Sequence, residues 1–71
     1  MNRVPVHSSA IRSIGYDELQ RILEVEFVSG RVYQYFGVPE ILYRGIRLAK
    51  SKGEYLARSI SNRFPSEEVR R

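Results

Sequence analysis

The strongest constraint on the fold is a short segment, residues 23–28, in which apolar and acidic side chains alternate. Leu23, Val25 and Phe27 are separated by Glu24 and Glu26. Because successive side chains of a strand point to opposite faces, this period of two predicts a half-buried β-strand with one core face and one wet face. Ser29-Gly30 follows as a turn signal, so residues 32–36 are expected to form the returning strand of a hairpin.

The length of the hairpin loop decides where two tyrosines of the returning strand point. With a two-residue loop, Tyr33 and Tyr35 lie on the solvent face beside the glutamates, where aromatic side chains at this spacing can stack on single-stranded RNA. With a three-residue loop, which places Gly30 in a bulge, both rings join the apolar face. We favour the three-residue loop because a layer of helices needs a broad apolar floor. Tyr33 and Tyr35 are therefore expected to be core residues more than site residues.

Three further segments complete the expected architecture. Residues 10–16 contain β-branched residues with weak alternation and are predicted to be the first strand. Pro39 suits a first helical position, and the helix that it begins is expected to run to Lys50. Residues 51–54 match a capping box that starts a second helix, which Pro65 ends. The packed face of the first helix is expected to contain Leu42, Ile46 and Ala49, flanked by Ile41, Gly45 and Leu48, and that of the second helix Leu56, Ile60 and Phe64, with Tyr55 and Ser59 beside them. The prediction is an α+β fold, in which a three-stranded antiparallel sheet is followed by two short helices packed on one face.

The size of the chain allows only one hydrophobic core. It has 71 residues, no cysteine and one histidine, so it has no disulfide or structural zinc site, and its stability must come from packing, helped by self-association. We expect a flexible lead-in at residues 1–8, a single domain at residues 9–65 and a polar tail at residues 66–71. No segment has the length of a signal peptide or of a membrane span, which predicts a cytoplasmic protein without a membrane partner.

Few residues are suited to catalysis. His7, the only histidine, lies in the expected lead-in, where it cannot be held in a catalytic geometry. Glu24 and Glu26 are interpreted as solubilising charges that balance arginines across the hairpin. The glycines match neither a phosphate-binding loop nor a dinucleotide fingerprint. We therefore expect a non-catalytic module that needs no cofactor and no metal.

The positive charge belongs to the second half of the chain. Residues 1–37 have as many basic as acidic side chains, so residues 38–71 account for the whole net charge of +4. The candidate phosphate-binding residues are Arg44, Arg47, Lys50, Lys52, Arg58 and Arg63, and Tyr43 among them is a candidate for stacking on an unpaired base. Such charges are also usual on a solvated helix face. Two hypotheses follow: an RNA-binding module, or a protein-interaction or structural module that uses an open sheet edge or the polar face of the hairpin.

A family resemblance covers residues 8–64. It is carried by Leu23-x-Val25-x-Phe27, Ser29-Gly30, Tyr33-x-Tyr35, Gly37-Val38-Pro39, Ala49-x-Ser51-x-Gly53-x-Tyr55 and Ile60. In this order the motifs resemble the KTSC domain, a family named after a segment at the C-terminus of some lysyl-tRNA synthetases and also found as small stand-alone bacterial and phage proteins. The resemblance implies a link to RNA through the synthetases, and it implies no catalytic residues. The Tyr-x-Tyr element of the family maps onto Tyr33 and Tyr35.

Overall fold

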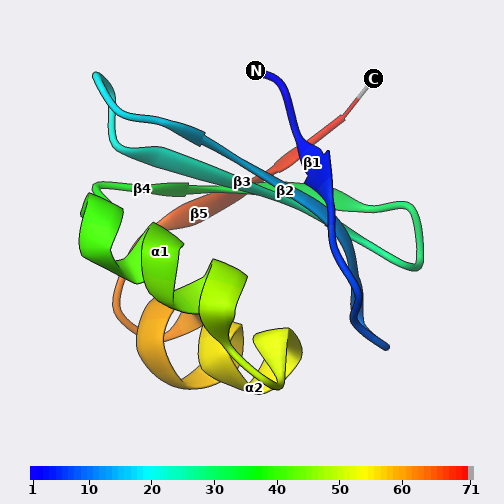
Figure 1. Ribbon diagram of the computed structural model, residues 1–71. Coiled ribbons are helices and arrows are strands. Elements are labelled where there is room, and N and C mark those ends of the chain that lie inside the picture. The colour runs from blue at the N-terminus through cyan, green and yellow to red at the C-terminus, as the bar shows by residue number, and fades with distance from the viewer. Residues whose placement is uncertain (71) are drawn as a thin grey trace.

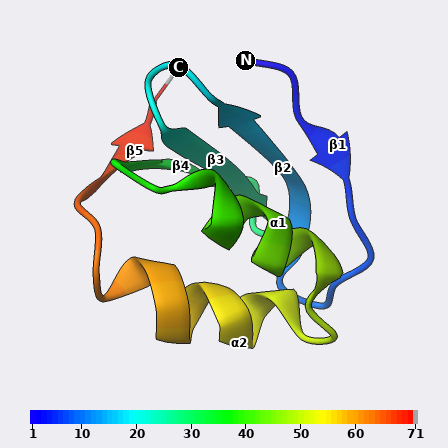
Figure 2. The ribbon, with the colours of Figure 1, turned by 60° about the vertical axis from the view of Figure 1, so that its left-hand side comes forward.

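The computed structural model describes residues 1–70 and contains one antiparallel sheet with a helical layer on one face (Figure 1). In chain order, the elements are β1 (Val4–Pro5), β2 (Ile11–Asp17), β3 (Ile22–Phe27), β4 (Val32–Phe36), α1 (Glu40–Leu48), α2 (Lys52–Leu56), the π-helical turn η1 (Ala57–Ser61) and β5 (Ser66–Val69). The strands lie side by side in chain order, so the helices form one long connection between β4 and β5. Figure 2 shows both helices on the same side of the sheet.

The sheet has five strands and not the three predicted, because both ends of the chain add an edge strand. β1 pairs with β2 through Val4 and Pro5, and β5 pairs with β4. Neither segment shows the alternation of a half-buried strand. An edge strand does not need it, because backbone hydrogen bonds to one neighbour hold the strand in place, and an edge position tolerates proline and charged side chains. The α+β class and the one-sided helical layer are confirmed. Residue 71, the last of the expected tail, lies outside the described residues.

The β3–β4 hairpin has the three-residue loop that we favoured. The Phe27 amide donates to the carbonyl of Arg31 over 2.9 Å, and Gly30 adopts a φ of +95°, which favours glycine. The register pairs Val25 with Tyr33 and Leu23 with Tyr35. Both rings therefore lie on the core side of the sheet, and Tyr35 is only 5% exposed.

The core lies between the helices and the inner face of the sheet. Its fully buried side chains are Ile11, Ile14, Leu23, Val25, Val38, Ile46 and Ile60. Ile46 and Ile60 belong to the apolar faces that the sequence periodicity predicts for the two helical segments. The periodicity thus identified the centre of each packed face correctly, but Ile41 and Leu48, expected to flank the packed face of α1, are exposed.

The outer face of the sheet carries a polar network where the alternation predicts a wet surface. The Arg3 guanidinium forms an ion pair with Glu24, and Gln34 Nε2 donates to the same carboxylate over 2.8 Å. Glu24 is 7% exposed, so its interpretation as a solvated charge is wrong. Gly15 permits the close crossing of the N-terminal segment, because a Cβ at this position would lie 2.6 Å from the backbone oxygen of Asn2. The ion pair therefore anchors β1 to the sheet.

The helices are shorter than predicted. α1 ends at Leu48, and the second helical segment ends with η1 at Ser61. The predicted cap is confirmed, because Ser51 Oγ accepts a hydrogen bond from the Glu54 amide over 3.4 Å. Within residues 1–70, no helix is long and apolar enough to cross a bilayer.

The contact between α1 and α2 depends on Gly45. A Cβ at this position would overlap the Tyr55 ring, 1.9 Å from the hydroxyl oxygen and 2.4 Å from Cζ. Gly45→Ala is therefore expected to lower the free energy of unfolding by about 1–3 kcal/mol. This loss should occur although alanine favours helix by about 1 kcal/mol over glycine.

Urea denaturation of Gly45→Ala, Tyr55→Ala and the double variant measures how much this overlap lowers the free energy of unfolding. The double variant should be more stable than Tyr55→Ala alone, because the overlap is gone and the gain in helix propensity remains. A Gly45→Ala chain as stable as the parent would contradict the prediction.

Candidate nucleic-acid interface

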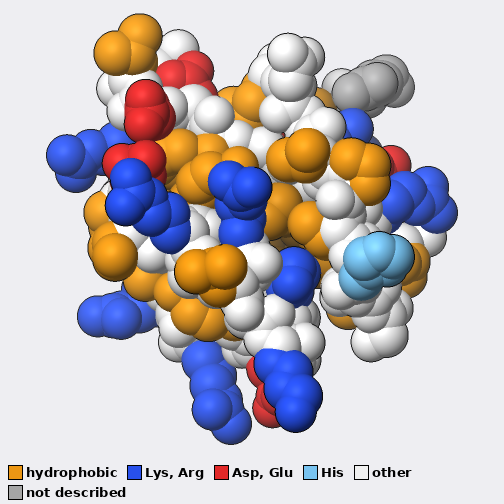
Figure 3. Space-filling model, in the orientation of Figure 1, with side chains coloured by type: hydrophobic (Ala, Val, Ile, Leu, Met, Phe, Trp, Pro, Cys, Tyr) orange, Lys and Arg blue, Asp and Glu red, His pale blue; other side chains and the backbone are white. Residues whose placement is uncertain are grey.

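The six predicted cations all project from the helical layer and the turn that follows it. Arg44, Arg47, Lys50, Arg58 and Arg63 are exposed, and Lys52 is half-buried. Figure 3 shows Lys and Arg side chains spread over the helical part of the molecule, with hydrophobic side chains visible between them. They do not form one continuous patch. Four of them line two separate hollows, Lys50 and Arg58 in one and Arg44 and Arg47 in the other. Lys52 and Arg63 line neither hollow.

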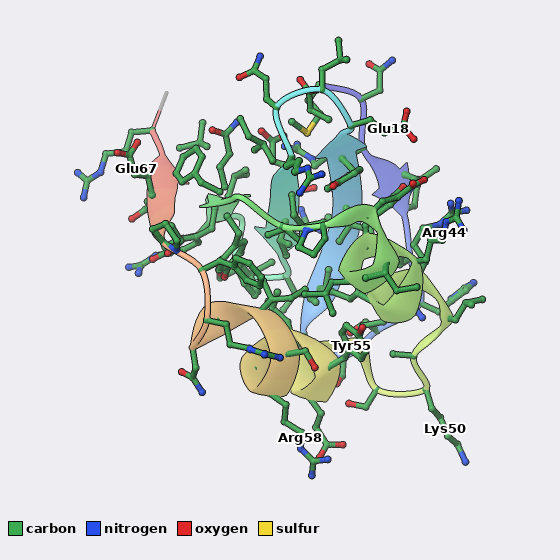
Figure 4. The ribbon with its side chains drawn as sticks, turned by 90° about the vertical axis from the view of Figure 1, so that its left-hand side faces the viewer. Glu18, Arg44, Lys50, Tyr55, Arg58 and Glu67 are labelled. Atoms are coloured by element: carbon green, nitrogen blue, oxygen red, sulfur yellow. The ribbon has the colours of Figure 1, made fainter. Side chains whose placement is uncertain are left out.

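The first hollow lies between the turn that joins α1 to α2 and the outer side of α2. Lys50 and Arg58 line this groove of about 370 Å³ together with Tyr55. In Figure 4, Lys50 and Arg58 extend from the same end of the helical layer, and Tyr55 lies deeper, between the helices. An aromatic ring between two cations can stack on a base while the cations contact the flanking phosphates.

The charges of this groove are only weakly neutralised by the protein itself. Glu54 approaches Arg58 at 3.8 Å, but both side chains are more than two-thirds exposed, and such pairs contribute little. Among residues 1–70, Lys50 has no carboxylate within 4.0 Å. Both cations therefore remain free to bind an anionic ligand.

The second hollow lies on the outward face of α1. Arg44, Arg47 and Leu48 line this space of about 350 Å³. Arg44 pairs with Glu40 one turn earlier at 3.3 Å, and the Arg47 guanidinium lies 5.5 Å from the centre of the Tyr43 ring. The two arginines thus already have partners within α1, in contrast to Lys50.

Tyr43 is engaged inside the molecule. Its ring stacks on Tyr16, with centroids 4.8 Å apart and planes 10° apart, and Arg47 lies over the same ring. The Tyr16 hydroxyl donates to the carbonyl of Val38, and burial raises the pKa of Tyr16, a rise that nearby carboxylates reinforce and Arg21 opposes. Stacking of a base on Tyr43 would require these contacts to open. Tyr55 also packs inside the molecule, with its hydroxyl end against Gly45, but it lines the groove of Lys50 and Arg58.

The two remaining cations differ in their surroundings. Lys52 Nζ donates to the carbonyl of Ala49 over 3.0 Å, so this side chain satisfies a backbone oxygen just beyond α1. Arg63 is exposed in the turn between η1 and β5. Lys52 therefore has a structural role, whereas Arg63 lies free beside the helical layer.

The two tyrosines of β4 belong to the core. Tyr35 is in the buried cluster, and Tyr33 is half-buried against the edge of Phe27, with ring centroids 5.8 Å apart. Burial raises the pKa of the Tyr35 hydroxyl above 10.0, and the Ser61 side chain partly offsets this rise. Stacking of RNA on this strand would require the helices to leave the sheet.

Tyr55 is the site residue that sequence reasoning missed. Its position beside the packed face of α2 indicated a core role, and only the turn after α1 brings Lys50 to it. A signal was available in the pattern Ala49-x-Ser51-x-Gly53-x-Tyr55, because Ala49, Ser51 and Tyr55 all line the groove. Gly53 of this pattern faces Ala10, with room for only a tight contact.

The fold and the groove define a class of small α+β domain, in which a five-stranded meander carries a basic helical connection between its last two strands. The family model of the KTSC domain matches residues 7–64. The chain therefore belongs to the KTSC domain family. The match excludes both edge strands, β1 and β5, so the family pattern is centred on the hairpin and the helices.

Three similar proteins illustrate the family. An uncharacterised protein of Stutzerimonas stutzeri is 47% identical over 55 residues, which is 78% of each chain. The lysine–tRNA ligase of Nostoc punctiforme is 34% identical over 61 residues, which cover 86% of this chain and 11% of the ligase. The crystal structure of a KTSC domain protein from Yersinia pestis has a TM-score of 0.91 and 41% identity, and 97% of each chain is covered.

Proposed function

We propose that this protein is a non-catalytic RNA-binding module and that the groove of Lys50, Tyr55 and Arg58 is the centre of its binding surface. The observation that carries the proposal is that two cations from different parts of the helical layer line one groove together with a tyrosine. Cations bind phosphates by releasing condensed counterions, and a half-buried ring accepts any base by stacking. This combination suits single-stranded RNA, whose bases are accessible.

Two further observations support the proposal. The net charge of +4 belongs entirely to residues 38–71, which contain the groove. The ligase of Nostoc punctiforme, which contains a similar domain, acts on tRNA as its name states. The polar groups of the groove also have structural partners, since Ser51 caps α2 and Glu54 faces Arg58, which favours binding over catalysis.

The double variant Lys50→Glu, Arg58→Glu is expected to bind RNA about 10- to 100-fold more weakly at low salt. The slope of log association constant against log salt concentration should be shallower than that of the parent by about 2, because two phosphate contacts are lost. Fluorescence anisotropy with a labelled tRNA and a labelled single-stranded RNA, at several salt concentrations, measures both quantities.

A matched control is available at the opposite side of the sheet. Arg31 and Arg70 line another hollow, beside the β3–β4 turn and the end of β5. The variant Arg31→Glu, Arg70→Glu has the same net charge as the groove variant and should bind RNA nearly as the parent does. Equal losses in the two variants would show that only net charge matters, and a parent that binds no RNA at low salt would overturn the proposal.

A second candidate function is the binding of a protein strand at the free side of β5. β5 is the last strand of the sheet and pairs only with β4, and Ser66 and Glu67 are exposed on it. A basic extended segment could add to this edge by backbone hydrogen bonding. Co-purification of one specific protein that survives nuclease treatment would favour this function over RNA binding.

A further inference from the structure

The three most exposed large apolar side chains of residues 1–70 lie on two neighbouring elements. Leu19, at the tip of the β2–β3 hairpin, is 96% exposed, and Leu48 and Ile41 of α1 are 86% and 69% exposed. Ile41 and Leu48 are two helical turns apart and so share one face of α1, opposite the buried Ile46. Exposed apolar side chains that share one surface with polar residues around them are a feature of interaction sites.

The charges around these side chains are separated by sign. Leu19 lines a hollow together with Asp17, Glu18 and Glu40, whereas Leu48 lines the hollow of Arg44 and Arg47. In Figure 3, acidic side chains gather at the upper left, where Figure 1 places the β2–β3 hairpin, and basic side chains lie below them over the helices. Leu19 thus forms an apolar knob surrounded by acidic side chains. It lies next to a hollow in which Arg44 and Arg47 flank Leu48.

The two halves belong to one continuous surface. Tyr43 lines the acidic hollow, and the guanidinium of Arg47 from the basic hollow lies over its ring. Ile41 follows Glu40 at the start of α1, so it lies between the hairpin tip and Leu48. We call this surface, made by Asp17, Glu18, Leu19, Ile41, Arg44, Arg47 and Leu48, the α1 face.

We propose that the α1 face is a self-complementary interface on which a second copy of this chain docks. In a two-fold arrangement, Leu19 of each copy enters the hollow of Arg44, Arg47 and Leu48 on the other. Glu18 of each copy then pairs with the arginines of its partner, and the two Ile41 side chains meet near the axis. A two-fold interface repeats each contact, so one chain supplies both the knob and the hollow.

The occupant is identified by the charge pattern. A partner for the hollow must present an apolar side chain among carboxylates, and the hairpin tip of the chain itself has this composition. In the described part of the chain, no carboxylate lies within 4.0 Å of Arg47, whose guanidinium lies over the Tyr43 ring, and no cation lies within 4.0 Å of Glu18, so neither charge is neutralised before the interface forms. The α1 face shares no lining residue with the groove of Lys50, Tyr55 and Arg58, so the proposed RNA site stays open.

A chain of this size has room for only a small interface, which implies a weak association. A stable interface of the smallest common size buries about 600 Å² on each partner, and the whole chain exposes 4913 Å². We therefore expect a dissociation constant in the micromolar range or above. Sedimentation equilibrium of the parent chain over about 10 μM to 1 mM should show a mass that rises from 8.3 kDa towards twice that value.

Charge reversal provides a sharp test of the two-fold pairing. Glu18→Arg and Arg44→Glu should each weaken the dimer by about tenfold or more, because each places like charges across both copies of the contact. An equimolar mixture of the two variants should recover the dimer, since each reversed charge then meets an opposite one. Recovery in the mixture would not occur if the face bound an unrelated acidic protein.

A matched pair of apolar substitutions controls for general effects of charge. Leu19→Lys should produce a monomer, whereas Val28→Lys, at the exposed β3–β4 turn, should leave the dimer unchanged. Circular dichroism checks that each variant is folded. A parent chain that is monomeric at all concentrations, a mixture that stays monomeric, or a mass that grows beyond the dimer would each overturn the proposal.

Discussion

Tyr35→Ala is expected to lower the free energy of unfolding by about 3–5 kcal/mol, the usual cost of removing a buried aromatic side chain. Tyr35 is 5% exposed on the inner face of β4, in the same cluster as Ile46 and Ile60 of the helical layer. A chain of 71 residues has about 4–11 kcal/mol of stability in total. The variant should therefore lose a large part of its stability. Urea denaturation followed by far-ultraviolet circular dichroism measures the loss.

Two control variants separate a core role of Tyr35 from a role in binding. Tyr35→Phe keeps the ring and should lose only about 1 kcal/mol. Tyr33→Ala should lose less than Tyr35→Ala, because Tyr33 is only half-buried. If Tyr35→Ala stayed fully folded and lost RNA binding, the strand would be a stacking platform, contrary to the packing that we describe.

Arg3→Met is expected to lower the free energy of unfolding by about 3 kcal/mol, because it leaves the carboxylate of Glu24 buried without its cation. The two side chains are only 19% and 9% exposed, so water cannot replace the lost partner. Gln34 would remain as a single neutral donor to Glu24. β1 should also loosen, since Arg3 beside it supplies side-chain contacts to Ser13 and Glu24 on the sheet. Chemical denaturation gives the loss, and hydrogen exchange at Val6 reports on the loosening, because its amide donates to Arg12.

Arg12→Met is the matched control for this ion pair. Arg12 lies 3.6 Å from Glu26 but is 58% exposed, so its removal should lower the free energy of unfolding by less than about 1 kcal/mol. The double variant Arg3→Met, Glu24→Met should recover much of the loss, since two apolar side chains replace the buried pair. Equal small losses for Arg3→Met and Arg12→Met would mean that Glu24 is solvated after all.

The proposed RNA site and the proposed dimer interface divide four of the six predicted cations between them. Lys50 and Arg58 belong to the groove with Tyr55, and Arg44 and Arg47 belong to the α1 face. A two-fold dimer would carry two grooves and would bind a long RNA more tightly than a short one by avidity. The groove variant should leave the dimer intact, and Leu19→Lys should leave a single groove functional. Failure of one proposal is therefore distinguishable from failure of the other.

The residues that alternate or recur at helical spacing were the most predictable part of the fold. The strand of Leu23 and Val25, the loop at Gly30 and the cap at Ser51 follow from local rules about period, backbone conformation and hydrogen bonding. The burial of Tyr35 followed from the loop length, because one residue of register exchanges the two faces of a strand. The edge strands β1 and β5 were missed, since no local pattern marks a segment that is held by its neighbour.

The sequence alone determined the α+β class, the family, the half of the chain that carries the positive charge and the apolar faces of the helices. Each of these depends on composition or on the spacing of nearby residues. Only the tertiary structure decided that Arg3 covers Glu24, that Tyr43 is stacked on Tyr16, and that Lys50 and Arg58 line one groove with Tyr55. These contacts depend on how separate elements cross, and the spacing of nearby residues does not specify a crossing.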